Sequence, residues 1–331
     1  MNIRIISPAG SIKGKVIDQG AETLRSWGHN VTFAPHAKGS YGRFAGTPED
    51  RVQDLIEALE DKSIDVIWCS RGGYGCMQLI EMLPLDLVSR ANKPIVGYSD
   101  ITILHALWQK AGIKSLHAPM MKHLGENPTH RTTQTIKELL EYYAAHRSWP
   151  QKHNLLFLKK ASLFVAPHQG WSPEDLNPEK TEEILDELMA HPVPMVGGNL
   201  AVLSGLHGSP YDFDYQDKLL FIEDISESPY KIDRMLQQLK ICGVFSKIKG
   251  LVCGHFTGCD EDPTMPVKLW DNIKSIVEPY GIPLPVTGQE ADAWKVIGKT
   301  LERSCDFSLE REHIHIIEDA QPRFTDFLGL G

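Results

Sequence analysis

Short apolar runs alternate with amphipathic stretches along the first third of the chain. The apolar runs at residues 3–6, 31–33 and 65–69 predict strands. The stretches 13–27 and 48–60, in which apolar residues recur at helical spacing, predict helices, and Thr47 stands where the second helix needs an N-cap. This alternation is typical of a mostly parallel sheet that helices cover on both faces, so it predicts an α/β fold.

A polar, proline-bearing stretch at residues 148–154 follows a predicted helix over residues 132–145. Because 331 residues exceed one ordinary core, we expect two domains, residues 1–150 and residues 151–331. The second domain is expected to contain, in order, a helix over 178–189, a tight turn entering a helix at 194–200, a strand over 218–224 and a helix over 229–239.

A serine stands at the corner between a predicted strand and a predicted helix. The run Pro94-Ile95-Val96-Gly97 predicts the strand, and residues 100–112 carry apolar side chains at helical spacing. A serine at this corner has its hydroxyl at the carboxyl edge of the sheet and its neighbouring amides at a helix N-terminus, where they can stabilise an oxyanion. Ser99 is therefore the candidate nucleophile, and the alternative is that it serves only as a helix N-cap.

A glycine-rich loop, Arg71-Gly72-Gly73-Tyr74-Gly75, follows the strand at residues 65–69 and precedes a predicted helix at 77–82. Ligands of open α/β sheets bind outside the carboxyl ends of the strands, so we expect this loop to meet Ser99 in one crevice. Its glycines let the backbone approach a ligand and point amides at negative charge. An oxyanion or carboxylate cradle next to Ser99 is therefore expected. The alternatives are a plain turn and a nucleotide phosphate site, and the absence of the GxGxxG and Walker patterns counts against the latter.

Two acids, Glu223 and Asp224, end the predicted strand at residues 218–224. Because side chains alternate along a strand, the two carboxylates are expected to face opposite ways. One of them can orient a catalytic base, as the third member of a triad does, while the other caps the helix at residues 229–239. The alternative is that both are solvated strand ends.

Composition and charge narrow the function classes. The net charge is −9 and no basic cluster is present, which gives no electrostatic footprint for nucleic acid or for an anionic membrane. No apolar run approaches the ~18 residues of a membrane span, and the start of the chain lacks the pattern of a signal peptide, so a cytoplasmic location is expected. The six cysteines are expected to be reduced thiols, and Cys253-x-His255-x-x-x-Cys259 matches no common zinc pattern.

These segments together resemble one family, the serine LD-carboxypeptidases of peptidoglycan recycling, which includes the microcin-immunity peptidases. The resemblance rests on motifs that occur in the same order: Phe44-Ala45-Gly46-Thr47 with Glu49 and Arg51; Ile67 to Gly75; Gly97-Tyr98-Ser99-Asp100-Ile101-Thr102; His117-Ala118-Pro119-Met120; Gly197-Gly198-Asn199-Leu200; and Phe221 to Asp224 with Pro229 to Leu236.

The resemblance implies a Ser-Glu-His triad with Ser99 as nucleophile and Glu223 orienting the base. It also implies an oxyanion hole formed by the amides of Gly73 and Asp100. Separately, we expect Arg71, Gly72 and Asn199 to bind substrate, with Arg71 or Asn199 on its terminal carboxylate because arginine offers bidentate geometry; the alternative is that either side chain is structural. The expected fold is an N-terminal domain similar to the class I glutamine amidotransferases with a smaller β-rich C-terminal domain, often in a homodimer. No metal or organic cofactor is implied. The expected substrate is a cytoplasmic muropeptide that ends in D-alanine.

The chain departs from the family where the catalytic histidine usually stands. No histidine occurs between His255 and His313, and the two possible alignments put Gln289 or Ala293 at that position. Neither side chain is a base near neutral pH. Three interpretations are therefore open: a muropeptide-binding protein without catalysis, an altered variant of an active enzyme, or an enzyme whose base comes from elsewhere, with His255 as the substitute.

Two further expectations concern the substrate. Residues 154–182 exceed what the short carboxypeptidases carry, and an insertion there would reshape the mouth of the pocket or the dimer contact. The alternative reaction is hydrolysis of a peptidyl or aminoacyl nucleotide, as in the microcin-immunity branch.

Overall fold

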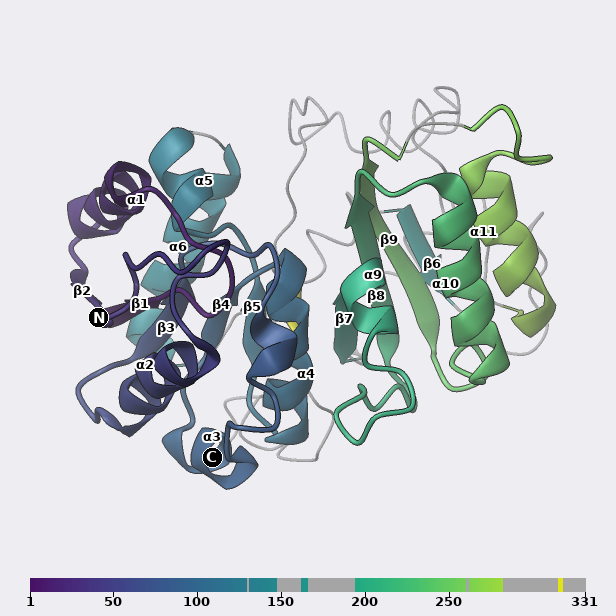
Figure 1. The fold of residues 1–331 in the computed structure, drawn as a ribbon. Helices are drawn as coiled ribbons and strands as arrows, with labels where there is room; N and C mark the ends of the chain where they lie inside the picture. The colour runs from purple at the N-terminus through teal and green to yellow at the C-terminus, as the bar shows by residue number, and fades with distance from the viewer. Residues whose placement is uncertain (130, 148–161, 166–193, 260–261, 282–314, 318–331) are drawn as a thin grey trace.

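The computed structural model describes residues 1–129, 131–147, 162–165, 194–259, 262–281 and 315–317. Within this part of the chain, two sheets lie beside one another, each with helices packed against it (Figure 1). The predicted two-domain α/β class is confirmed, whereas the boundary near residue 150 stays a prediction because residues 148–161 lie outside the described part.

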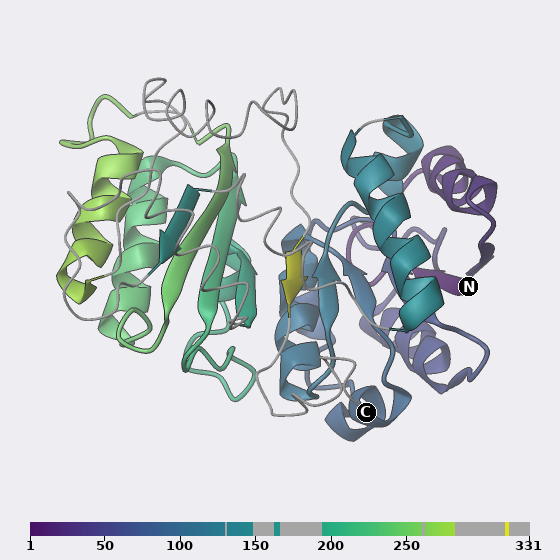
Figure 2. The same cartoon turned by 180° about the vertical axis from the view of Figure 1, so that it is seen from behind.

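The first sheet has the strand order β10-β5-β4-β3-β1-β2. Its strands from the first half of the chain are parallel, and β10 joins β5 in the antiparallel direction (Figure 2). The strands are β1 (Asn2–Ile6), β2 (Asn30–Phe33), β3 (Val66–Cys69), β4 (Ile95–Gly97), β5 (Ser115–His117) and β10 (His315–Ile317).

The second sheet has the order β6-β9-β8-β7, in which β7, β8 and β9 are parallel and β6 is antiparallel to β9. Its strands are β6 (Ser162–Val165), β7 (Met195–Asn199), β8 (Leu219–Ile225) and β9 (Gly250–Thr257). The helices α9, α10 and α11 lie together against it (Figure 1). Their bounds are Leu200–Ser204, Pro229–Ile241 and Leu269–Val277, and a short 3₁₀ turn, η4 (Glu278–Tyr280), follows.

The helices of the first half are α1 (Gly14–Ser26), α2 (Pro48–Glu60), α3 (Leu85–Ala91), α4 (Thr102–Lys110), α5 (Met121–Glu126) and α6 (Arg131–His146), with the 3₁₀ turns η1 (Cys76–Gln78) and η2 (Ser99–Ile101). Helix α2 shows why these boundaries form. Thr47 and Asp50 make a reciprocal capping box, and Pro48 occupies the first helical position, where its missing N–H costs nothing.

Two predicted elements differ from the structure. The segment 77–82 is not a regular helix: the 3₁₀ turn Cys76–Gln78 forms, and the backbone N–H groups of Leu79 and Met82 donate to residues three positions earlier, the pattern of tight turns. Residues 195–199 are the strand β7 rather than a tight turn. Its glycines serve close approach instead, since a Cβ on Gly197 would collide with the carbonyl oxygen of Phe221 in β8.

The two sheets meet through α4, which packs against β7 (Figure 1). The Asn199 backbone N–H donates to Thr102 Oγ1 at 3.0 Å, and a Cβ on Gly198 would collide with the same hydroxyl. At the other end of α4, the buried Gln109 amide makes a paired contact with the backbone of Asp214, at 2.8 and 3.0 Å. Buried apolar residues of both halves form one continuous core.

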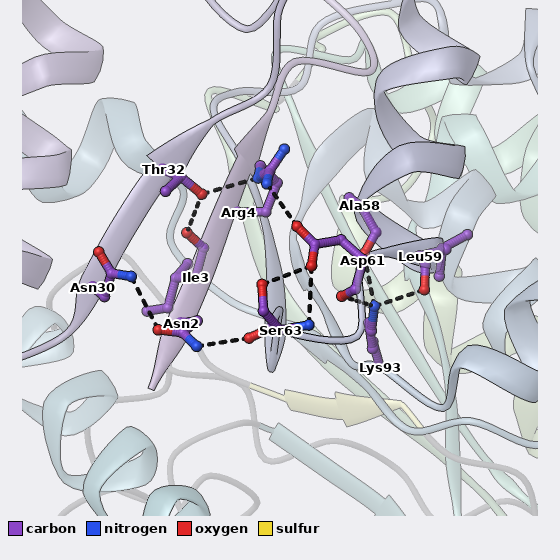
Figure 3. A network of polar contacts seen from close by, with 10 residues as sticks. All are labelled: Asn2, Ile3, Arg4, Asn30, Thr32, Ala58, Leu59, Asp61, Ser63 and Lys93. Atoms are coloured by element: carbon purple, nitrogen blue, oxygen red, sulfur yellow. Dashed lines mark hydrogen bonds and ion pairs between the residues drawn. The ribbon is translucent and has the colours of Figure 1, made fainter.

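A polar network closes the end of the first sheet where α2 stops (Figure 3). The buried Lys93 ammonium donates to the carbonyl oxygens of Ala58, Leu59 and Asp61 at 2.9, 2.6 and 2.7 Å. These are carbonyls that the last turn of a helix leaves without partners. The Asp61 carboxylate in turn pairs with Arg4 at 3.1 Å. Lys93 therefore fixes the C-terminal end of α2, and the segments described next lie at its N-terminal end.

Candidate active site

Ser99 follows β4 directly and has φ +63°, a left-handed conformation that costs a serine about 1–2 kcal/mol. It opens the turn η2, whose N-cap is Tyr98, and no side chain caps that turn. The structure therefore does not support the interpretation of Ser99 as an N-cap. A strained serine between a strand and a helix is instead the geometry that exposes a nucleophilic hydroxyl.

The glycine loop, residues 71–75, passes against this serine. A Cβ on Gly72 would lie 2.9 Å from Ser99 Cβ and 3.1 Å from Ser99 Oγ, so this position accepts only glycine. The next residue, Gly73, has φ +112°, which also requires glycine. The structure thus places the glycine loop against Ser99 at Gly72, and the crevice that the sequence predicts between them stays a prediction.

Asp100 contributes two groups to this region. Its carboxylate is buried and accepts a hydrogen bond from the backbone N–H of Cys76 at 2.8 Å. Burial raises the pKa of Asp100, while the hydrogen bonds from Cys76 and the charge of Arg51 favour its ionised form. Because the side chain is held in this way, the backbone amide of Asp100 keeps a fixed position next to Ser99.

Arg71 is half-buried at the start of the glycine loop. Its Nη1 donates to the carbonyl oxygen of Ser11 at 3.1 Å, and its Nη2 lies 3.6 Å from the point where a Cβ on Gly73 would stand. No carboxylate in the described part of the chain forms an ion pair with it. A guanidinium in this setting is suited to the carboxylate of a ligand.

Asn199 ends β7, and its side chain is engaged within the fold. Its Oδ1 accepts from the backbone N–H of Val202 at 3.1 Å and so caps α9, while its Nδ2 donates to Asp224 Oδ1 at 3.0 Å. This capping function was not predicted from the sequence, although an asparagine immediately before a helix is a recognised signal for it.

The Glu223 and Asp224 side chains have different contacts, in keeping with the alternation expected along β8. The Asp224 carboxylate accepts the backbone N–H of Ala201 at 2.9 Å, so it supports the start of α9. The prediction that the second acid caps the helix at residues 229–239 was wrong, because α10 has no side-chain cap and α9 lies closer to Asp224. Glu223 shares the other face with Phe221, since a Cβ on Gly254 would touch both side chains.

The Glu223 carboxyl group is incompletely partnered. The residue as a whole is half-buried, but its Oε1 is buried and has no hydrogen-bond partner among the described residues. Burial is the main reason that the pKa of Glu223 rises from 4.5 to about 8, with a further increase from the charge of Asp224. The side-chain amide of Asn199 partly opposes that increase.

A β-bulge in β9 lies opposite Glu223. Ile222 pairs with Cys253 and Asp224 pairs with Phe256, so two residues of β9, Gly254 and His255, stand opposite the single residue Glu223. The backbone of His255 is therefore next to that of Glu223, although its side chain lies outside the described part of the structure. A bulge depends on pairing between strands, so periodicity along one strand could not predict it.

A second histidine, His117, is buried where the two sheets meet. It was not among the bases predicted from the sequence. Its ring centroid lies 5.2 Å from that of Phe221 and 6.0 Å from that of Tyr98. These neighbours flank the two predicted catalytic residues, because Tyr98 precedes Ser99 and Phe221 shares a strand face with Glu223. The nucleophile turn and the acid-bearing strand thus converge on one junction.

Some predicted features lie outside the described part of the chain, namely Gln289, Ala293 and most of residues 154–182. Within the described residues, no three His, Cys, Asp or Glu side chains are grouped so that they could hold a metal ion. The helices of this same part include none with the length and apolar character needed to cross a membrane.

Comparison with known proteins gives consistent matches over both halves. Residues 3–118 match the LD-carboxypeptidase N-terminal domain family, and residues 193–289 match the LD-carboxypeptidase C-terminal domain family. A probable murein peptide carboxypeptidase of Bacillus subtilis is 31% identical over 268 residues, which cover 80% of this chain and 74% of that protein.

Solved structures share the fold. The muramoyltetrapeptide carboxypeptidase of Oxalobacter formigenes superposes with a TM-score of 0.65 at 23% identity, covering 86% of this chain and 92% of that one. The microcin C7 self-immunity protein superposes with a TM-score of 0.64 at 20% identity, covering 86% of this chain and 85% of that one.

Proposed function

The chain belongs to the LD-carboxypeptidase family, and from this premise we propose that it is a serine carboxypeptidase that removes a terminal D-alanine from muropeptides. The observation that carries the proposal is the left-handed Ser99 at the end of β4, pressed against the glycine loop. The relatives named for murein peptides support the substrate class.

In the proposed reaction, Ser99 Oγ attacks the carbonyl carbon that precedes the terminal D-residue, and a base takes the hydroxyl proton. The amides of Gly73 and Asp100 donate to the oxyanion, which they reach from the glycine loop and from the start of η2. Collapse of the intermediate breaks the C–N bond, and the protonated base returns its proton to the leaving amine. Water then hydrolyses the acyl-serine by the same steps.

Glu223 orients the base in this proposal, and His255 supplies the imidazole. Support for His255 comes from the bulge, which sets its backbone opposite Glu223. Support for an imidazolium partner comes from Glu223 itself, because a buried carboxyl group with Oε1 unpartnered among the described residues needs a positive neighbour to ionise at neutral pH.

Arg71 binds the terminal carboxylate of the peptide, and Gly72 and Asn199 line the subsite. Arg71 suits this function because its guanidinium lies beside Gly73 and pairs with no carboxylate of the described residues. The side-chain amide of Asn199 is already engaged with Val202 and Asp224, so its contribution is to hold the wall of the subsite. The setting we propose is the cytoplasm, with the enzyme as a homodimer and no nucleic-acid or membrane partner.

The experiment follows D-alanine release from L-Ala-γ-D-Glu-diaminopimelate-D-Ala by mass spectrometry, with the wild type and single variants. Ser99→Ala and His255→Ala are expected to lose at least about 1,000-fold in kcat, as loss of a triad member does elsewhere. His146→Ala, which changes an exposed histidine on α6, is the matched control and is expected to keep full activity. Undiminished activity of Ser99→Ala would refute the assignment of Ser99 as the nucleophile.

Three other outcomes have definite meanings. Loss of D-alanine release in Ser99→Ala but not in His255→Ala would assign the base to another histidine. His117→Gln would then test the imidazole that lies next to Phe221, where the two sheets meet. Binding of the intact tetrapeptide without release by the wild type would replace the enzyme proposal with a muropeptide-binding protein. Hydrolysis of an aminoacyl sulfamoyl nucleoside but not of the tetrapeptide would favour the microcin-immunity reaction.

A further inference from the structure

One peptide group of the glycine loop lies between two buried charges. Arg51 Nη1 donates to the carbonyl oxygen of Gly75 at 2.9 Å, and the backbone N–H of Cys76 donates to Asp100 Oδ2 at 2.8 Å. The carbonyl of Gly75 and the N–H of Cys76 belong to the same peptide unit. The guanidinium and the carboxylate are therefore joined through a single peptide dipole, with the positive charge at its oxygen and the negative charge at its N–H.

Arg51 is 1% exposed, yet it has no direct carboxylate partner in the described part of the chain. Its other donors go to the carbonyl oxygens of Gly46 and Pro8, at 3.0 and 2.6 Å, and to Gln78 Oε1 at 2.6 Å. A buried cation is destabilising unless its hydrogen bonds are made and a counter-charge is near. Asp100, itself 4% exposed, is the buried carboxylate placed to balance it.

Gly75 is fitted to this arrangement. It has φ +140°, which only glycine adopts without strain, and a Cβ at this position would lie 2.6 Å from Arg51 Nη1. The guanidinium therefore occupies the space that any side chain at residue 75 would need. This complementarity explains why the third glycine of the loop belongs to the contact with Arg51 rather than to the surface facing a ligand.

Arg51, the Gly75–Cys76 peptide group and the Asp100 carboxylate form a clamp. This clamp acts on both sides of Ser99. Asp100 follows Ser99 in the chain, while the other end of the glycine loop touches Ser99 at Gly72. The carbonyl oxygen of Gly72 also accepts from the backbone N–H of Gly10 at 3.2 Å. The peptide group held between Arg51 and Asp100 thus links the glycine loop to the residue that follows Ser99.

We propose that Arg51 and the Asp100 side chain are positioning residues that hold the glycine loop in register with Ser99, so that the oxyanion donors are in place before substrate binds. This inference rests on the proposed function, because the loop amides matter only for acyl transfer. In this proposal both side chains act through the Gly75–Cys76 peptide rather than on the substrate itself.

The structure offers a matched control in Lys93. Like Arg51, Lys93 is a buried cation that donates to main-chain carbonyls, but it holds the opposite end of α2 (Figure 3). Lys93→Met therefore tests what the loss of a buried cation does to the fold alone. Gln78→Met is a mild companion variant, because it removes one acceptor of Arg51 from an exposed residue and leaves both charges in place.

The experiment measures kcat and KM for D-alanine release, together with hydrogen–deuterium exchange of the peptides that cover residues 70–79. Arg51→Met is expected to lower kcat about 100-fold with KM changed less than about threefold, since a donor displaced by a fraction of an ångström weakens transition-state binding. Exchange in residues 70–79 should accelerate at least about tenfold. Arg51→Lys and Gln78→Met should show smaller changes of the same kind. Lys93→Met should change neither kcat nor the exchange of residues 70–79.

The double variant gives an independent signature. Arg51→Met with Asp100→Asn should lose less activity than the product of the two single losses, because each single change leaves the other charge buried alone. Multiplicative losses, or an Arg51→Met protein with the kcat and exchange of the wild type, would overturn the inference. If Arg51→Met does not fold, Arg51→Lys and Gln78→Met decide the question by the same readouts.

Failure of the proposed function is recognised separately. A wild type that releases no D-alanine refutes the carboxypeptidase, whereas the exchange measurement still tests the clamp. In that case, if residues 70–79 exchange as slowly in Arg51→Met as in the wild type, the clamp is refuted as well.

Discussion

Replacement of Glu223 by glutamine is expected to change the pH dependence of stability in a way that reports on the predicted acid. Gln keeps the size of the side chain and one acceptor oxygen but cannot ionise. In the folded protein, burial raises the pKa of Glu223 to about 8, against 4.5 in the unfolded chain. The folded state therefore holds this proton more tightly than the unfolded state does.

The direction follows from that difference in proton binding. Below pH 4.5 both states carry the proton, and Glu223 imposes no penalty; between pH 4.5 and about 8 only the unfolded state releases it, so the wild type loses stability as pH rises. At ~1.4 kcal/mol per pH unit the full effect is roughly 5 kcal/mol. Because the residue is half-buried as a whole, we expect solvent screening to reduce it to roughly 2–4 kcal/mol.

The assay is urea unfolding of the wild type and Glu223→Gln at several values between pH 4.5 and 9. Relative to the wild type, Glu223→Gln should gain those 2–4 kcal/mol across the interval and level off above pH 8. The exposed Glu81→Gln serves as control and should parallel the wild type within about 0.5 kcal/mol. A constant difference between Glu223→Gln and the wild type over the whole range would refute the argument that the carboxyl group is buried and incompletely partnered.

Three further predictions use the same unfolding assay. Ser99→Gly should be more stable than Ser99→Ala by about 1 kcal/mol, because glycine relieves the left-handed backbone; equal stability would contradict the strain, and neither variant should release D-alanine. Gln109→Leu should cost about 2–3 kcal/mol, since it leaves the backbone groups of Asp214 unpaired, whereas the exposed Gln53→Leu should cost less than about 0.5. Thr47→Val should cost about 1 kcal/mol through loss of the capping box, and a neutral effect would show that solvent replaces it.

The elements that the sequence predicted well depend on local signals. Helix α2 begins at Pro48 and ends at Glu60 as expected, because its cap residues and its apolar spacing lie within the helix and its first turn. Ser99 was also found from neighbours in the chain, since a strand, a glycine and a helix pattern surround it. Such features need no knowledge of which segments meet in space.

The features that escaped prediction depend on contacts between remote segments. Gly197 and Gly198 suggest a turn when read locally, but they lie in a strand because β8 and α4 approach too closely for side chains. The bulge opposite Glu223 exists only as a relation between two strands. The clamp joins Arg51 of α2, the glycine loop and the residue after Ser99, which no sequence periodicity connects.

The contact between Gly198 and Thr102 limits how this architecture can be recombined. The backbone of β7 lies directly on the first residue of α4, so a side chain at 198, or a larger one at 102, would push the acid-bearing half away from the nucleophile-bearing half. A chimera that joins the first half of this chain to the second half of a relative should therefore assemble only when this small-residue pair is inherited intact. Residues 102 and 198 must therefore be exchanged together, although one begins α4 and the other lies in β7, almost a hundred residues further along the chain.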